Sequence, residues 1–275
     1  MKTIFTAVFL VSFSICFAQK PDADKLLEEG KMLYYLEKAS WYATDHFLEA
    51  FKSKIDQIRG YLSYYGNNGK VYSIFYSQSQ TGEIELLARY MFDADPKPDF
   101  ISLDTLSLKP LPIEYELFTL RNSTLKLMYE NDDDFFLFYE NTSNNIIPII
   151  DKKERKVYIL TASEQYGNVF IGNDYLLTFT PKGNLKDKRK LHNTLIEIPY
   201  KNPGKEKITT TMHTHILSNH IEPTDICTLL LYRDYVEWDE HFVIHKDYIS
   251  IFDLKDEMLT IMKKKDFEKI VNSIK

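Results

Sequence analysis

The second half of the sequence is constrained by a series of short strand-like segments. From residue 146 on, β-branched and aromatic runs alternate with turn residues, as at 168–171 and 175–180. In the first half, residues 22–60 and 112–131 carry apolar residues at helical spacing, with a hairpin over 70–92 between them. The sequence therefore predicts an α+β fold, in which N-terminal helices and a β-hairpin precede a mixed β-sheet domain.

Local patterns predict the elements around the later part of the chain. Residues 135–139 and 191–198 have the composition of strands. The residues Gly172-Asn173-Asp174 predict a hairpin turn. A strand ending at Met212 is followed by a short helix that we expect to begin at Pro223 and end near Tyr232.

Residues 1–18 have the pattern of a secretory signal peptide. A basic start precedes an apolar run over residues 3–17, and the small residue Ala18 marks the expected cleavage point. The mature chain would comprise a helical and β-hairpin region over 19–140 and an α+β domain over 141–275. We expect an exported protein, periplasmic or extracellular, without a transmembrane segment after cleavage, because no later stretch is apolar enough to span a membrane.

Charge and cysteine content narrow the function classes. Without the signal peptide, the chain keeps 33 of its 34 basic residues and all 40 acidic residues, which gives a formal net charge of −7. Nucleic-acid binding requires a basic surface, so no nucleic-acid partner is expected. Cys227 is the one cysteine after residue 18, so no intramolecular disulfide is expected. Its apolar neighbours predict a buried side chain rather than a nucleophile.

A cluster of histidines is the strongest candidate for a chemical site. In a strand, His213 and His215 point to the same face, because side chains alternate with a period of two. Asp225, on the first turn of the following helix, supplies a carboxylate, so these three residues predict a metal site suited to zinc. The other histidines nearby are expected to have packing, surface or loop roles; they are His192, His220, His241 and His245.

This arrangement resembles the JAMM/MPN metallopeptidases over residues 155–262. The segment His213-Thr214-His215 is similar to the His-x-His pair of that family. Thr224 stands near the position of its serine, and Asp225 stands for its aspartate. The resemblance implies zinc-dependent hydrolysis of an amide or isopeptide bond in a protein or peptide substrate.

The resemblance also implies a catalytic glutamate upstream of the histidines. Glu164 precedes a strand as the family's glutamate does and is assigned as the general base, with Glu197 as the second choice. Two departures from the family pattern lie close to the histidines. Ile216 replaces the family's proline, and the interval between the second histidine and the aspartate is one residue shorter than is usual.

The alternative is a non-catalytic exported protein on the same scaffold, with a binding or structural role. Asp225 then caps its own helix, and the histidines form ordinary hydrogen bonds. The segment 170–175, the histidine pair, residues 224–228 and the later Tyr-x-Ser-Ile strand are together similar to secreted proteins of Bacteroidota-type bacteria. That likeness implies export and no particular activity.

Overall fold

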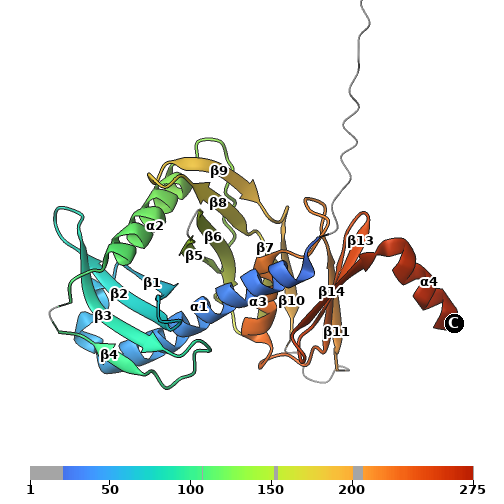
Figure 1. Cartoon of the computed structure of the whole chain (residues 1–275), viewed down its shortest axis with the longest axis horizontal. Coiled ribbons are helices and arrows are strands. Elements are labelled where there is room, and N and C mark those ends of the chain that lie inside the picture. Colours follow the sequence, from blue (N-terminus) through green and yellow to red (C-terminus); the bar gives the residue numbers. More distant parts are fainter. Residues whose placement is uncertain (1–20, 107, 152–153, 201–206, 275) are drawn as a thin grey trace, which may run out of the picture.

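The computed structural model describes residues 21–106, 108–151, 154–200 and 207–274 (Figure 1). The predicted signal peptide, residues 1–18, lies outside the described residues. The chain has an α+β fold, as predicted. The helices are α1 (Ala23–Ala50), the 3-10 helix η1 (Lys52–Gln57), α2 (Pro112–Glu130), α3 (Pro223–Tyr232) and α4 (Lys264–Ile274).

The strands form several sheets. One sheet has the order β1-β2-β3-β4, with β1 (Gly60–Tyr65), β2 (Val71–Gln78), β3 (Ile84–Phe92) and β4 (Ser102–Asp104). A second has the order β5-β6-β8-β9, with β5 (Thr142–Ile150), β6 (Arg155–Ser163), β8 (Tyr175–Phe179) and β9 (Leu185–Lys190). A two-stranded ribbon pairs β7 (Asn168–Gly172) with β10 (Leu195–Pro199).

The last sheet carries the candidate site. Its order is β11-β12-β13-β14, with β11 (Thr210–Thr214), β12 (Glu240–Ile244), β13 (Tyr248–Asp253) and β14 (Met258–Lys263). Strand β11 is parallel to β12, whereas the other pairs are antiparallel, so the sheet is mixed. Helix α3 lies in the connection between β11 and β12, as the crossover between parallel strands requires.

Four local predictions were wrong. The first helix, predicted over residues 22–60, ends at Ala50; the 3-10 helix η1 follows, and Gly60 belongs to β1, which pairs along its whole length with β2. Residues 135–139 are not a strand, since the Asn131 side chain binds both backbone groups of Phe136 and holds the chain in a turn.

The other two errors lie near the site. Residues 191–198 are not one strand, because β9 and β10 belong to different sheets and residues 191–194 between them are irregular. Gly172-Asn173-Asp174 is likewise not a hairpin turn. It carries the chain from β7, in the two-stranded ribbon, to β8, in the four-stranded sheet.

Helix α1 packs across most of the molecule. It contacts β1 and β2 in the first half of the chain and α3 and β14 in the second (Figure 1). The largest hydrophobic cluster accordingly contains Leu33 and Phe75 together with Val243 and Phe252. The predicted division near residue 140 coincides with the start of β5, and the core packs across it.

Candidate metal centre

Strand β11 presents its histidines on one face. Burial alternates along the strand: Thr211, His213 and His215 are buried, whereas Met212 and Thr214 are exposed. The pairing with β12 continues one residue past the strand, because the His215 amide donates to the Ile244 carbonyl at 2.9 Å. His213 and His215 therefore point to the same side, as the period of two predicts.

Helix α3 brings Asp225 to the same point. Pro223 stands at the start of the helix, where its missing N–H costs no hydrogen bond. The Asp225 side chain is 1% exposed, and its Oδ2 accepts a hydrogen bond of 2.9 Å from the Glu222 amide. Asp225 thus caps its own helix with one oxygen. Its other oxygen, Oδ1, has no hydrogen-bond partner.

A fourth residue, His192, joins these three from the irregular segment 191–194 between β9 and β10. Gly172 makes this possible: its φ is +101°, and a Cβ there would stand 2.3 Å from the Thr194 carbonyl oxygen. The Asn173 amide donates to that same oxygen at 3.1 Å. The segment 191–194 is therefore held tightly against the β7–β8 crossover, which places the His192 side chain in the interior.

His192, His213, His215 and Asp225 form a compact buried group. Their ligand atoms all lie within 4.8 Å of one another, and each residue is at most 8% exposed. Asp225 Oδ1 is 2.9 Å from His192 Nε2 and 3.7 Å from His213 Nε2, while its Oδ2 is 3.2 Å from His215 Nε2. His192, for which the sequence predicted a packing or surface role, thus lies with the three predicted ligands as a fourth candidate.

The outer hydrogen bonds of His215 determine which of its ring nitrogens carries hydrogen. Ser218 Oγ donates to the His220 carbonyl at 2.8 Å, so its hydrogen is not available to the ring. The 3.0 Å contact between Ser218 Oγ and His215 Nδ1 must then be donated by Nδ1–H. In the neutral ring the Nε2 lone pair consequently points at the other members of the group.

His213 is oriented by a chain of side chains. Its Nδ1 lies 2.7 Å from His241 Nε2, and His241 Nδ1 lies 2.7 Å from Thr211 Oγ1. With each ring donating outward through Nδ1–H, the chain is satisfied and the His213 Nε2 lone pair faces the centre. Burial lowers the pKa of His241 to about 4, so His241 is neutral and can accept this bond.

His192 has a carboxylate behind it. Its Nδ1 lies 3.4 Å from Asp174 Oδ2, while Asp174 Oδ1 accepts from the Thr161 amide at 2.9 Å. A carboxylate or other acceptor behind a ligating imidazole is the usual support of a metal site, because it sets the tautomer and orientation of the ring. All three histidines have such support from outside the group.

Inside the group, the Nε2 atoms of the three histidines and Asp225 Oδ1 are buried and face one another. His192 Nε2 and Asp225 Oδ1, 2.9 Å apart, form an ion pair when His192 carries a proton, whereas the Nε2 atoms of His213 and His215 have no hydrogen-bond partner among the described residues. Buried polar atoms are rarely left without partners, because each costs on the order of 1–3 kcal/mol. One cation at the centre would satisfy all four, so these residues could hold a metal ion.

The pKa shifts differ between members of the group. Burial holds the pKa of His213 well below its ordinary value and so favours its neutral form. Burial alone would raise the pKa of Asp225, but the surrounding imidazoles hold it well below its ordinary value. Burial alone would lower the pKa of His192, but the carboxylates of Asp225 and Asp174 outweigh it and raise this pKa well above its ordinary value. In the metal-free protein, a proton on His192 therefore supplies the positive charge beside Asp225.

A cavity of ≈ 220 Å³ reaches the exposed side of this group. It is lined by His192, His213 and His215, with Thr194 and Ile196 among the other residues. Its described lining contains no carboxylate side chain. Access to the three imidazoles is therefore through polar but uncharged and apolar surface.

The two glutamates assigned as general base lie elsewhere. Glu164 follows β6 in an exposed turn, where its amide donates to the Asn141 carbonyl at 3.0 Å. Glu197 is exposed on β10, opposite Phe170. Neither lines the cavity beside the histidines. The role of Glu164 remains a prediction, with His213, His215 and Asp225 brought together as expected.

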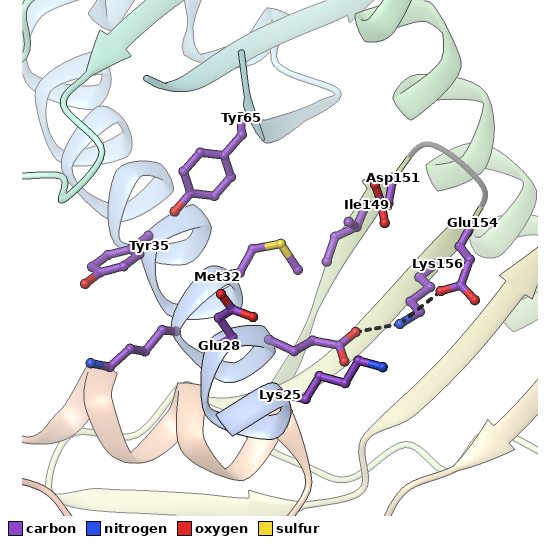
Figure 2. A pocket seen from close by; sticks show the side chains of 11 residues that line it. Lys25, Glu28, Met32, Tyr35, Tyr65, Ile149, Asp151, Glu154 and Lys156 are labelled. Carbon is purple, nitrogen blue, oxygen red and sulfur yellow. Dashed lines mark hydrogen bonds and ion pairs between the residues drawn. The ribbon is translucent and has the colours of Figure 1, made fainter. Parts of the chain in front are cut away.

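A larger cavity, of ≈ 830 Å³, lies between α1 and the β5–β6 strands (Figure 2). Three of its charged side chains pair with one another: Lys156 Nζ lies 2.7 Å from Glu29 Oε1 and 3.3 Å from Glu154 Oε2. Tyr158 also donates to Glu29 at 2.8 Å. None of the described lining side chains has a buried polar atom without a partner, so the cavity shows no demand for a ligand comparable to that of the histidine group.

Known proteins provide no family or function for this site, so its role is inferred from its own geometry. No model of a known protein family and no curated protein matches the chain. The C-terminal domain of Bacillus megaterium YpeB is similar over 57% of this chain, with 11% sequence identity and a TM-score of 0.20. The match spans 65% of that domain's length, and a likeness this slight carries no argument. The resemblance to the JAMM/MPN family therefore stays a prediction.

Within the described residues, no helix has both the length and the apolar character needed to cross a bilayer.

Proposed function

We propose that this protein binds one zinc ion through His192, His213, His215 and Asp225. The observation that carries the proposal is the convergence of three buried imidazole Nε2 atoms and the Asp225 carboxylate, with all four ligand atoms within 4.8 Å of one another. Zinc takes imidazole nitrogen and carboxylate oxygen in tetrahedral coordination, which matches this set of donors. The outward-facing Nδ1 hydrogen bonds of His213 and His215 support the same assignment, because they leave the Nε2 atoms of these two rings free for the ion.

The first role proposed for the ion is to stabilise the fold. Its ligands come from the break after β9, the end of β11 and the start of α3, so the ion would join segments that belong to different sheets. Four protein ligands are typical of closed structural sites. In a chain with a single described cysteine, Cys227, which is free and buried, a metal would cross-link segments where no disulfide does.

A second candidate function is zinc-dependent hydrolysis of an amide or isopeptide bond in an exported protein, as the JAMM resemblance implies. The cavity beside the imidazoles favours it, because a substrate carbonyl needs access to the ion. When bound, zinc would polarise that carbonyl and lower the pKa of water. Catalysis requires an open coordination position, so one of the four protein ligands would have to yield to water.

Metal analysis of the purified mature protein tests the first proposal. We expect one zinc ion per chain, a higher melting temperature with zinc than after chelation, and loss of both effects in His192→Ala, His213→Ala and Asp225→Asn. His220→Ala is the matched control, since His220 lies in the same loop but its Nδ1 contacts the Ile221 carbonyl. Absence of stoichiometric zinc in the folded wild-type protein would overturn the proposal.

The catalytic candidate needs its own measurement. Zinc-loaded protein is incubated with peptide and isopeptide-linked substrates, and cleavage is followed by mass spectrometry. Cleavage that disappears in His213→Ala and persists in His220→Ala supports hydrolysis. A protein that binds zinc stoichiometrically, yet cleaves none of these substrates, has the stabilising role alone.

A further inference from the structure

The β11–β14 sheet has an apolar outer face, opposite to the face that carries the metal group. Side chains alternate along each strand, so Met212, Phe242 and Ile251 lie on the side away from His213 and His215. These three residues are neighbours in the register of β11, β12 and β13. Met212 is 61% exposed, and Phe242 and Ile251 are half-buried. A contiguous apolar row of this kind is typical of an interaction site.

Helix α4 covers only one end of this outer face. The ring of Phe267, on the second turn of α4, packs on Phe242 with 6.1 Å between the ring centroids, and Ile249 at the same end is buried. Beyond Phe267 the helix extends away from the sheet (Figure 1). Ile270 and Val271 lie on the same side of the helix as Phe267 and are 49% and 36% exposed. The apolar stripe of α4 therefore continues past the surface that it covers.

The end of the outer face from which α4 starts is basic. The residues that line a surface cavity there include four lysines and two carboxylates, namely Lys246, Asp247, Lys263, Lys264, Lys265 and Glu268. The Lys264 amide donates to the Asp247 carbonyl at 2.9 Å, which holds the start of α4 against the β12–β13 turn. Lysine charge thus predominates at this end, although the chain as a whole is acidic.

The opposite end of the outer face is acidic. Glu240 and Asp253 are paired in the β12–β13 register and lie in one row with Met258 of β14. Asp256 is exposed in the β13–β14 turn, and Lys255 lies beside it, so carboxylates outnumber lysine there. The length of β13 separates this acidic end from the basic end.

Opposite charges at the two ends of one apolar face make that face self-complementary. A two-fold axis through its middle would place the basic end of one chain against the acidic end of another, and the apolar residues of each against their counterparts. An anionic membrane, which basic amphipathic helices commonly bind, would instead meet Glu240 and Asp253 on the same face and be repelled by them. The charge pattern therefore favours a second copy of this chain over a lipid surface.

We propose that the outer face of the β11–β14 sheet and the exposed part of α4 form the interface of a two-fold symmetric homodimer. Met212, Met258, Ile270 and Val271 are its exposed apolar residues. The histidine group lies on the inner face of the same sheet, so the dimer forms without needing a metal ion.

The first test is the oligomeric state of the mature protein as purified, measured by sedimentation over a concentration series. We expect a dimer that dissociates on dilution. Ile270→Asp and Val271→Asp should each weaken dimerisation at least about ten-fold, because the two-fold axis places each change in the interface twice. Tyr129→Asp is the control, since Tyr129 is 93% exposed on α2. Circular dichroism checks that each variant is folded; both target positions are exposed, so the native fold should persist.

The second test addresses the charged ends. Glu240→Lys and Lys265→Glu should each weaken the dimer, and added salt should weaken the wild-type dimer, because the complementary charges are screened. Glu49→Lys makes the same charge change at an exposed position of α1 and should leave the dimer intact. A dimer that responds equally to Glu240→Lys and Glu49→Lys would not be held by this face.

Three results would overturn the proposal. One is a protein that stays monomeric up to about 100 μM, where even a weak specific dimer is populated. Another is a dimer that Ile270→Asp and Val271→Asp leave unchanged, since its interface then lies elsewhere. The third is a monomer that binds phosphatidylcholine–phosphatidylglycerol vesicles and loses this binding in Val271→Asp, because a lipid surface then covers α4.

Discussion

Gly30 of α1 lies directly against Ile226 of α3: a Cβ on Gly30 would stand 2.6 Å from the Ile226 Cβ and 3.1 Å from the Pro223 carbonyl oxygen. Gly30 does not interrupt α1, which runs from Ala23 to Ala50. Instead, its missing side chain lets α1 and α3 approach closely at Ile226, the residue that follows Asp225 of the metal group.

Gly30→Ala should destabilise the protein although alanine favours helix. The added methyl group must push the helices apart, and overpacking of this kind costs about 1–3 kcal/mol, more than the helix propensity gained. Urea denaturation measures the change. Asp45→Ala, at an exposed position of the same helix, is the control and should remain near wild type. Equal stability of the two variants would contradict close α1–α3 packing.

Gly172→Ala should weaken metal binding without changing any ligand. A Cβ at Gly172 would collide with the Thr194 carbonyl and displace the segment that carries His192. Gly183 also has a positive φ, of +79°, but a Cβ there meets open space, so Gly183→Ala carries the backbone strain alone. Zinc affinity, measured by competition with a chelating dye, should fall only in Gly172→Ala. A similar loss in both variants would mean that strain, rather than displacement of His192, is responsible.

His241→Gln should lower zinc affinity by about 10- to 100-fold while the ion remains bound to the same residues. His241 accepts from His213 Nδ1 and orients that ring, so its loss affects the ligand indirectly. X-ray absorption of the zinc-loaded variant checks that the ligand set is unchanged. Unaltered affinity would show that the chain from His213 to Thr211 does not support the metal.

Glu164→Gln should leave zinc affinity unchanged, because Glu164 is exposed in the turn after β6 and does not line the cavity at the histidines. If the protein hydrolyses a peptide bond with Glu164 as its base, the same variant should lower kcat while zinc affinity stays unchanged. Measurement of both quantities in one preparation separates the two roles. Reduced zinc affinity in Glu164→Gln would place this carboxylate nearer the ion than the structure does.

Glu37 should make stability depend on pH. This carboxyl is 2% exposed and accepts one hydrogen bond of 2.7 Å from Asn145; burial raises its pKa from 4.5 to about 7. Between these values the folded state holds the proton more tightly than the unfolded state, so its contribution to stability is full below pH 4.5 and is lost as pH rises toward 7.

Glu37→Gln removes that dependence. Relative to wild type, the variant should gain stability at pH 8, by up to roughly 3 kcal/mol, and little at pH 4. Denaturation curves at both pH values provide the measurement, with the exposed Glu49→Gln as control. A difference between Glu37→Gln and wild type that is the same at both pH values would show that Glu37 does not titrate as its burial requires.

The sequence predicted the elements whose pattern is local. The bounds of α3, the common face of His213 and His215, and the position of Asp225 at a helix start follow from periodicity and capping, and all are present. His192 could not be found in this way. Its place depends on a break between two sheets and on the close approach of Gly172 to Thr194, which strand composition does not encode.

The sequence did contain one feature that bears on the position of His192, but this feature is also compatible with a different local structure. Gly172-Asn173-Asp174 has the composition of a hairpin turn, and the distinction between a hairpin and a crossover depends on which distant strands β7 and β8 pair with. Long-range pairing also explains why residue 60 is not helical as predicted, since Gly60 begins β1, which aligns with β2. Errors thus occurred where tertiary pairing overrode local propensity.

The core shared by both halves has a consequence for how this chain reaches its native state. Residues such as Leu33 and Phe252 belong to one hydrophobic cluster although most of the sequence separates them. Contacts of such high sequence separation form slowly, since a long loop must close before they contribute. The packing of α1 against α3 and β14 therefore forms only after these C-terminal elements are available, whereas its contacts with β1 and β2 can form earlier.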